Sequence, residues 1–233
     1  MIHGAAMTAT RRAASPLESC LLSAVGGCVD AIGLITLGGL FVSHMSGNTA
    51  SLGAAFGQGH WSVGLPHLFA VPVFVLGLFL GYFWVGQSPR RCALVFLIEA
   101  ALLALFGLGL RLHDGVRSDT PAYYLLAALP LLAMGLQNAT LRQVGHSTFP
   151  STYVTGVLDR LAKSAALWVR LRRTPDGAGH GRDALISVGV WLAYVTGAIG
   201  GGAGLLFLRP LALLVPILIL VGLAIPLSRE AEA

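Results

Sequence analysis

The sequence predicts an all-α membrane protein: six transmembrane helices forming two three-helix repeats of inverted topology, each repeat with a Gly-containing helix break. Three observations support this fold class, namely long apolar runs, basic residues at the ends of those runs, and a weak internal repeat. Hydrophobic residues make up 55% of the 233 residues and charged residues only 11%. A soluble domain carries about 25% charged residues to cover its surface, so this chain belongs in lipid.

Six runs are long enough to cross a bilayer, whose core requires about 20 mostly apolar residues per helix. Backbone groups exposed to lipid must be hydrogen-bonded within the segment, and the runs are too long and too continuously apolar to be barrel strands. Residues 1–17 precede the first run, which is too long for a cleaved signal peptide. The runs are residues 18–41, 64–86, 92–112, 122–145, 184–208 and 210–228.

The basic residues indicate the orientation of these six spans. With the N-terminus inside, all arginines and the lysine except Arg111, Arg117 and Arg209 fall on the cytoplasmic side, as the positive-inside rule requires. Both tails, residues 1–17 and 229–233, are therefore expected in the cytoplasm, and the connecting loop 113–121 outside.

An internal repeat relates residues 18–112 to residues 122–228. An Asp or Asn followed by Ala precedes a Phe at the same spacing in both halves, and a Ser/Thr-Gly step follows. Because three helices per repeat is an odd number, the second half would enter from the opposite side, as in transporters that bind solute between rocking halves. The pairs are Asp30 and Asn138, Phe41 and Phe149, Ser46-Gly47 and Thr155-Gly156, and Phe74–Gly77 and Tyr194–Gly197.

A polar but uncharged segment follows the first span. Gly47 favours a helix break there, and Ser46 or Asn48 is suited to cap a new helix. Thr49 is a further polar residue of this segment. Such a break would turn unpaired backbone amides toward an anion or a polar solute. An outside loop with a capped interfacial helix is the simpler interpretation, and the sequence leaves both open.

The second half repeats the break at Pro150 and Gly156 and then becomes amphipathic and basic over residues 157–173. Apolar residues recur at helical spacing among several arginines and Lys163, a pattern typical of a helix on an anionic membrane surface. Asp159 lies four residues before Lys163, so it belongs either to a solute pathway or to an ordinary surface ion pair.

Here the chain resembles a known family. The run from Val29 to Gly33, followed by Phe41 to Thr49, and the later Thr152 to Leu158 with Gln137 to Ala139, resemble the YoaK-like family of uncharacterised bacterial membrane proteins. The resemblance covers roughly residues 18–226. It implies a small six-helix protein of the bacterial inner membrane, and it implies no particular substrate or reaction.

Ionisable and amide groups lie deep in the expected spans. Asp30 is near the middle of the first span, and Glu99 lies eight residues past Arg91, about 12 Å into the membrane. A buried carboxyl in a membrane is usually neutral, paired or beside a wet cavity, so proton coupling and a structural hydrogen bond are both open. Asn138 and Gln137 would line the same cavity or bond across helices. His44 would titrate near neutral pH or play a structural role at a helix end.

These features favour a transporter of a small polar solute or ion, with proton coupling as an option. The alternative is a non-catalytic accessory protein that docks a partner through residues 157–173; a lipid enzyme ranks third, because no nucleophile and base converge. We expect no enzyme activity, no cofactor, no metal site and no nucleic-acid partner. The expected surroundings are the lipid bilayer, and the sequence leaves a homo-oligomer open. The candidate pathway residues are Asp30, His44, Ser46, Gly47, Asn48, Thr49, Glu99, Gln137, Asn138, Thr155, Gly156 and Asp159.

Overall fold

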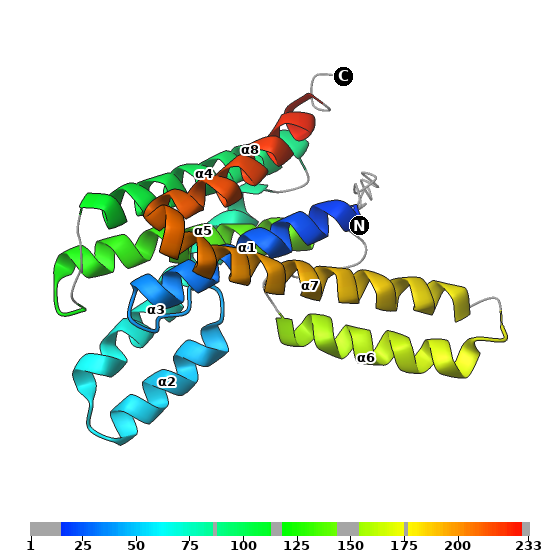
Figure 1. Ribbon diagram of the computed structural model, residues 1–233, viewed down its shortest axis with the longest axis horizontal. Coiled ribbons are helices and arrows are strands. Elements are labelled where there is room, and N and C mark those ends of the chain that lie inside the picture. The colour runs from blue at the N-terminus through cyan, green and yellow to red at the C-terminus, as the bar shows by residue number, and fades with distance from the viewer. Residues whose placement is uncertain (1–14, 86–87, 113–117, 144–153, 175–176, 230–233) are drawn as a thin grey trace, which may run out of the picture.

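The computed structural model describes residues 15–85, 88–112, 118–143, 154–174 and 177–229, and these ranges contain helices and no strand (Figure 1). Phe149 and Pro150, most of the expected N-terminal tail and residues 113–117 of the expected 113–121 loop lie outside the described residues. The elements are α1 (Pro16–Thr36), α2 (Met45–Gly57), α3 (Trp61–Val85), α4 (Pro89–Leu112), α5 (Pro121–Gln143), α6 (Val154–Leu171), α7 (Gly177–Leu208), the 3₁₀ helix η1 (Arg209–Leu213) and α8 (Leu214–Arg229).

Five stretches of the described chain are long and apolar enough to cross a membrane. Four of them match expected spans, although α1 ends at Thr36 rather than near residue 41. The fifth runs over 52 residues and contains α7, η1 and α8, where the sequence analysis separates two spans. The stretches are 16–36, 61–84, 90–112, 121–140 and 177–228.

Local sequence explains where α1 begins and ends. Ser15 and Glu18 form a capping box, in which Glu18 N–H donates to Ser15 Oγ at 3.1 Å and Ser15 N–H donates to the Glu18 carboxylate at 2.9 Å. At the other end, Gly38 and Gly39 adopt positive φ angles of 66° and 93°. Residues with a side chain rarely adopt these angles, so the two glycines stop the helix and turn the chain back.

Two longer stretches lie between expected spans, one between residues 41 and 64 and one between residues 145 and 184. The first contains α2 and the second contains α6. The position expected for the breaks was wrong, because Gly47 and Gly156 are the third residues of α2 and α6 and lie inside helix. The turn before α2 is made by the glycines at the end of α1. The expected cap was also wrong: the N-cap residue of α2 is His44, and its side chain makes no capping hydrogen bond.

Helices pack across the two halves of the sequence. α1 packs along α7, α3 packs along α5, and α4 packs against α8, while the hairpins α2–α3 and α6–α7 extend in different directions (Figure 1). Glycines make the first two crossings close. A Cβ at Gly27 would lie 2.1 Å from the Tyr194 carbonyl oxygen, and one at Gly135 would lie 2.4 Å from the Phe74 carbonyl oxygen.

The glycines of α3 and α7 face the same interfaces from the other side. Added Cβ atoms at Gly77 and Gly197 would lie 2.6 and 2.1 Å from the carbonyl oxygens of Leu132 and Ala24. The sequence places Gly77 and Gly81, Gly197 and Gly201, and Gly200 and Gly204 one helical turn apart, a spacing that predicts close helix packing. This packing role is confirmed at Gly77, Gly81, Gly197, Gly201 and Gly204. It was wrong for Gly200, which has no heavy atom within 4 Å of an added Cβ.

Candidate functional site

Asp30 is the centre of a buried hydrogen-bond cluster. Its Oδ1 accepts from the backbone N–H of Val42 at 2.9 Å and of Ser43 at 3.0 Å. Its Oδ2 accepts from Ser43 Oγ at 2.9 Å, from the Tyr194 hydroxyl at 2.7 Å and from His44 Nδ1. A carboxylate has about four lone-pair sites and can satisfy most of these donors together, so this side chain of α1 holds the segment before α2 and also binds α7.

His44 is oriented by the same carboxylate. Its Nδ1 contacts Asp30 Oδ2 in a charge-assisted pair, and its ring meets those of Phe41 and Tyr194 edge to face at centroid distances of 5.9 and 5.6 Å. An ionised carboxylate only accepts hydrogen bonds, so Nδ1 carries a proton. Nε2 is therefore the ring nitrogen that Asp30 does not bind.

Asn48 holds the same segment from the side of α2. Its amide nitrogen donates to the Phe41 carbonyl at 2.7 Å, and its Oδ1 accepts from the Phe41 N–H at 3.2 Å. His67 of α3 contacts the same Oδ1 through Nδ1 at 3.0 Å. The side chain of Asn48 is fully buried, so Phe41 is fixed to α2, and α2 is fixed to α3.

A cavity of about 280 Å³ lies beside this cluster. We call it the His44 cavity. It brings together the predicted site residues His44, Ser46, Asn138 and Thr155, which come from the first turn of α2, from α5 and from the first turn of α6. Its lining residues are Ser43, His44, Met45, Ser46, Phe74, Leu78, Tyr82, Asn138, Val154 and Thr155.

Other predicted residues do not line this cavity. Glu99 of α4 is fully buried, and neither carboxyl oxygen has a hydrogen-bond partner among the described residues. Gln137 is buried and donates to the Leu22 carbonyl at 2.7 Å, as expected for an amide that joins two helices. Thr49 bonds back to Met45 within α2, and Asp159 is exposed on α6.

Gly47 contributes through its lack of a side chain. A Cβ there would lie 3.0 Å from the ring of Phe41, so glycine lets this ring pack directly on the first turn of α2. Gly156 occupies the same position in α6.

Three residues of the cluster were missed as site residues by sequence reasoning. Ser43 and Tyr194 complete the donors around Asp30, and His67 supports Asn48. Tyr194 could have been found from the sequence, because the repeat pairs it with Phe74. The two rings differ only by the Tyr194 hydroxyl, and an added polar group inside an apolar span is a signal of a specific partner. His67 was detectable as a histidine inside an otherwise apolar span.

The described residues contain no group of three or more His, Cys, Asp or Glu side chains that could hold a metal ion. Cys20, Cys28 and Cys92 are free thiols, and the last two are buried in the apolar core. Buried free cysteines commonly act as small apolar side chains, and Cys28 and Cys92 fit that role.

Comparisons with known proteins identify the family. Residues 19–225 match the family described as "Protein of unknown function (DUF1275)". The chain is 31% identical over 195 residues to the UPF0700 transmembrane protein RA0705 of Rhizobium meliloti, covering 84% of this chain and 78% of that protein.

A second relative is the UPF0700 transmembrane protein YoaK of Bacillus subtilis, 28% identical over 146 residues. That match covers 60% of this chain and 63% of YoaK, so it spans less than two thirds of the relative's length. No solved structure matches the chain. The relatives are transmembrane proteins of bacteria and the fold holds several apolar helices of spanning length, so the chain is a multi-pass membrane protein that belongs to the DUF1275 family.

Proposed function

We propose that this protein transports a small polar solute across the bacterial inner membrane, with the His44 cavity as its binding site. The observation that carries the proposal is that the first turns of α2 and α6 meet at one cavity. Ser46-Gly47 and Thr155-Gly156 are the second and third residues of these helices, and they are also the pair related by the sequence repeat. The cavity volume is near the lower end of the range for ligand pockets, about 300–1,000 Å³.

The glycine crossings support an inverted repeat. Gly27 and Gly135 are separated by the same offset as Asp30 and Asn138, and Tyr194 and Phe74 by the same offset as Gly197 and Gly77. The contact of Gly27 with Tyr194 is therefore the counterpart of the contact of Gly135 with Phe74. Reciprocal contacts of this kind are expected when two similar halves are related by a twofold axis, as in many secondary transporters.

Six crossings fit this proposal. The 52-residue apolar stretch is about 78 Å long as a helix, more than twice a bilayer core of about 30 Å. Divided at η1, it supplies two spans, and α2 and α6 become re-entrant helices. The positive-inside rule then puts both termini in the cytoplasm.

The helix contacts also suggest which parts move. α1 and α6 both pack on α7, whereas α2 and α5 both pack on α3, so each group contains helices from both halves. We therefore assign alternating access to movement between these two groups, and not to rocking of one sequence half against the other. Asp30 in the first group binds the segment 42–44 attached to the second, and these bonds would break and re-form in each cycle.

Proton coupling, where it operates, would use the Asp30–His44 pair. A proton delivered to this pair weakens the acceptor that holds Val42, Ser43 and Tyr194, and so favours separation of the two groups. Proton binding and movement are thereby linked through the same atoms.

Thermal stabilisation of the purified protein by a metabolite library tests the proposal, since a ligand that binds the native state raises its stability. A stabilising compound is then tested for uptake into proteoliposomes. Ser46→Ala and Thr155→Val should weaken its binding, whereas Thr49→Val, outside the cavity lining, should not. Absence of any stabilising compound, or normal binding by both cavity variants, contradicts the proposal.

One observation favours the accessory-protein alternative. The basic helix α6 keeps Trp168 and Val169 exposed, at 48% and 60% of their surface. If docking through this face is the function, Trp168→Ala should release a co-purifying partner and leave ligand binding in the His44 cavity unchanged.

A further inference from the structure

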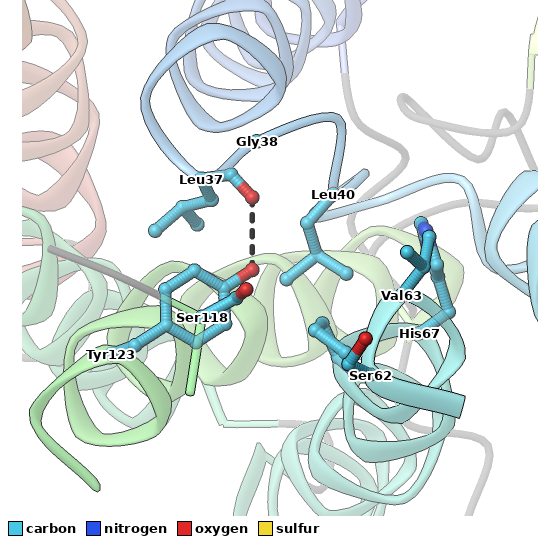
Figure 2. A pocket seen from close by; sticks show the side chains of 9 residues that line it. Leu37, Gly38, Leu40, Ser62, Val63, His67, Ser118 and Tyr123 are labelled. Atoms are coloured by element: carbon cyan, nitrogen blue, oxygen red, sulfur yellow. Dashed lines mark hydrogen bonds between the residues drawn. The ribbon is translucent and has the colours of Figure 1, made fainter. Parts of the chain in front are cut away.

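A second cavity is lined in part by residues of the same segment between α1 and α2. It has a volume of about 360 Å³, and we call it the His67 cavity. Figure 2 shows that its side chains come from the end of α1, the start of α3 and the start of α5, with the Tyr123 hydroxyl donating to the Leu37 carbonyl at 2.8 Å. Its lining residues are Leu37, Gly38, Leu40, Ser62, Val63, Pro66, His67, Ser118 and Tyr123.

Hydrogen bonding fixes the chemistry that His67 offers to a ligand. Asn48 donates its amide N–H to the Phe41 carbonyl, so its Oδ1 is the acceptor, and His67 Nδ1 must donate to it. A neutral ring protonated at Nδ1 has a lone pair at Nε2, and no described residue donates to that atom. His67 is only 8% exposed, so a buried acceptor is available in the wall of the cavity.

The other lining residues define a class of ligand. None of the nine carries a formal charge, Ser62 and Ser118 provide hydroxyls, and Leu40 and Val63 provide apolar surface. This lining suits a small uncharged molecule that bears O–H or N–H donors and has an apolar part.

The two cavities present matched groups, and their linings flank one short segment in sequence. Each has a histidine whose Nδ1 is bound to a neighbouring side chain and whose Nε2 remains for a ligand, together with serine hydroxyls. Leu40 lines the His67 cavity and Ser43 lines the His44 cavity, three residues apart and so within about 10 Å along the chain. Only Phe41 and Val42 lie between them in sequence, held by Asn48 and Asp30.

We infer that the His67 cavity is a second binding site for the transported solute, the first one reached from the side on which α1 ends, and that Phe41–Val42 is the barrier between the two sites. The inference rests on the proposed transport function. It names the solute class as a small uncharged molecule with hydrogen-bond donors. Asn48 keeps the barrier closed, because it binds both the N–H and the carbonyl group of Phe41. Asn48 is itself bound by His67, which lines the His67 cavity.

Cysteine accessibility tests the inference in the full-length protein, with the three native cysteines replaced by alanine. The probe is MTSET, a thiol reagent that does not cross membranes. Ser62→Cys should react from the side on which α1 ends, the periplasm in the proposed orientation, and Ser46→Cys only from the opposite side. Adding Asn48→Ala should raise the rate at Ser46→Cys from the first side at least tenfold.

Thr49→Ala is the matched control, because Thr49 is the next residue of α2 and its hydroxyl bonds only Met45. It should leave Ser46→Cys protected. His67→Leu is a second test of the latch, since it removes the group that supports Asn48, and it should act in the same direction as Asn48→Ala. Reaction of Ser46→Cys from both sides without either change, or continued protection in both variants, overturns the barrier.

Ligand protection separates this inference from the transport function itself. A compound found by thermal stabilisation should slow MTSET at both Ser62→Cys and Ser46→Cys. Protection at Ser46→Cys alone would keep the transport site and refute the second site. If Ser62→Cys instead reacts from the cytoplasmic side and Ser46→Cys only from the periplasmic side, the result supports the barrier and contradicts the proposed orientation.

Discussion

An alanine at Gly197 tests the close approach of α1 and α7. A Cβ at this position would lie 2.1 Å from the carbonyl oxygen of Ala24, whereas ordinary van der Waals contact begins at 3.4 Å. The obstructing atom is backbone and cannot rotate away. The two helices must therefore separate by about 1 Å or more to accommodate the methyl group.

The expected cost follows from this geometry. Overpacking typically costs about 1–3 kcal/mol, and separation of the helices would also stretch the 2.9 Å bond from Ser23 Oγ to the Val190 carbonyl. Gly200 is the matched control in the same helix, because an added Cβ there meets nothing within 4 Å. Alanine is favoured over glycine in helices by up to about 1 kcal/mol, so Gly200→Ala should stabilise.

Thermal unfolding in detergent with a thiol-reactive dye measures both variants. Cys28 is a native reporter, since it is buried and its backbone packs against Gly201 in the same crossing. For a chain of this length, 1 kcal/mol corresponds to roughly 2–4 °C in Tm. We expect Gly197→Ala to lower Tm by roughly 4–8 °C and Gly200→Ala to raise it by roughly 2–4 °C.

Equal shifts for the two variants, or an unchanged Tm for Gly197→Ala, would refute the close crossing of α1 and α7. Gly77→Ala provides the corresponding measurement at the crossing of α3 and α5, where the added Cβ would lie 2.6 Å from the Leu132 carbonyl oxygen. A loss similar to that of Gly197→Ala is expected, because both substitutions push apart two backbones.

Four further substitutions give sharp expectations. Tyr194→Phe removes a hydroxyl bonded to Asp30 and should lower the free energy of unfolding by about 1.5–3 kcal/mol, measured in the same dye assay. Asp30→Asn should destabilise more, because the amide NH₂ would face three donors that now bind Oδ2; a Tm equal to that of the natural chain would count against the cluster. Glu99→Gln should keep Tm within a few degrees and, if this carboxyl carries protons, remove the pH dependence of transport in proteoliposomes. Arg209→Gly should raise stability by about 1 kcal/mol, since Arg209 has a positive φ of 52° that glycine adopts freely; a lower Tm would show that the arginine side chain outweighs this strain.

Sequence patterns predicted the helical membrane class well, because apolar runs and terminal basic residues report directly on lipid burial. They also identified Asp30 as a central group from its place in the repeat. The glycine spacing predicted helix crossings correctly, but it could not tell Gly200 from Gly197, since the two residues are three apart and neighbours on α7, and only the packing of α1 selects between them.

The local geometry of the site was not predictable in the same way. The Ser46-Gly47 step suggested a break at Gly47, whereas the turn before α2 is made by Gly38 and Gly39. Asn48 was expected to cap α2, yet its amide binds Phe41 across the turn. Tyr194 lies 164 residues from the carboxylate that it binds, and no local pattern reports a contact at that separation.

That separation has a consequence for biogenesis. α1 is synthesised first and α7 near the end, so Asp30 waits for Tyr194 until 164 further residues have been made. At a translation rate of about 5–20 residues per second, this interval is roughly 8–30 s. During it the carboxyl and the bare glycine face of α1 stand in the bilayer without their final partner, at a cost of a few kcal/mol for the acidic group. Nascent chains released before α7 would keep the bonds of Asp30 to Val42, Ser43 and His44 but lack the Tyr194 hydroxyl and the cover over the glycines of α1. The uncovered face of α1 therefore distinguishes truncated chains from finished ones.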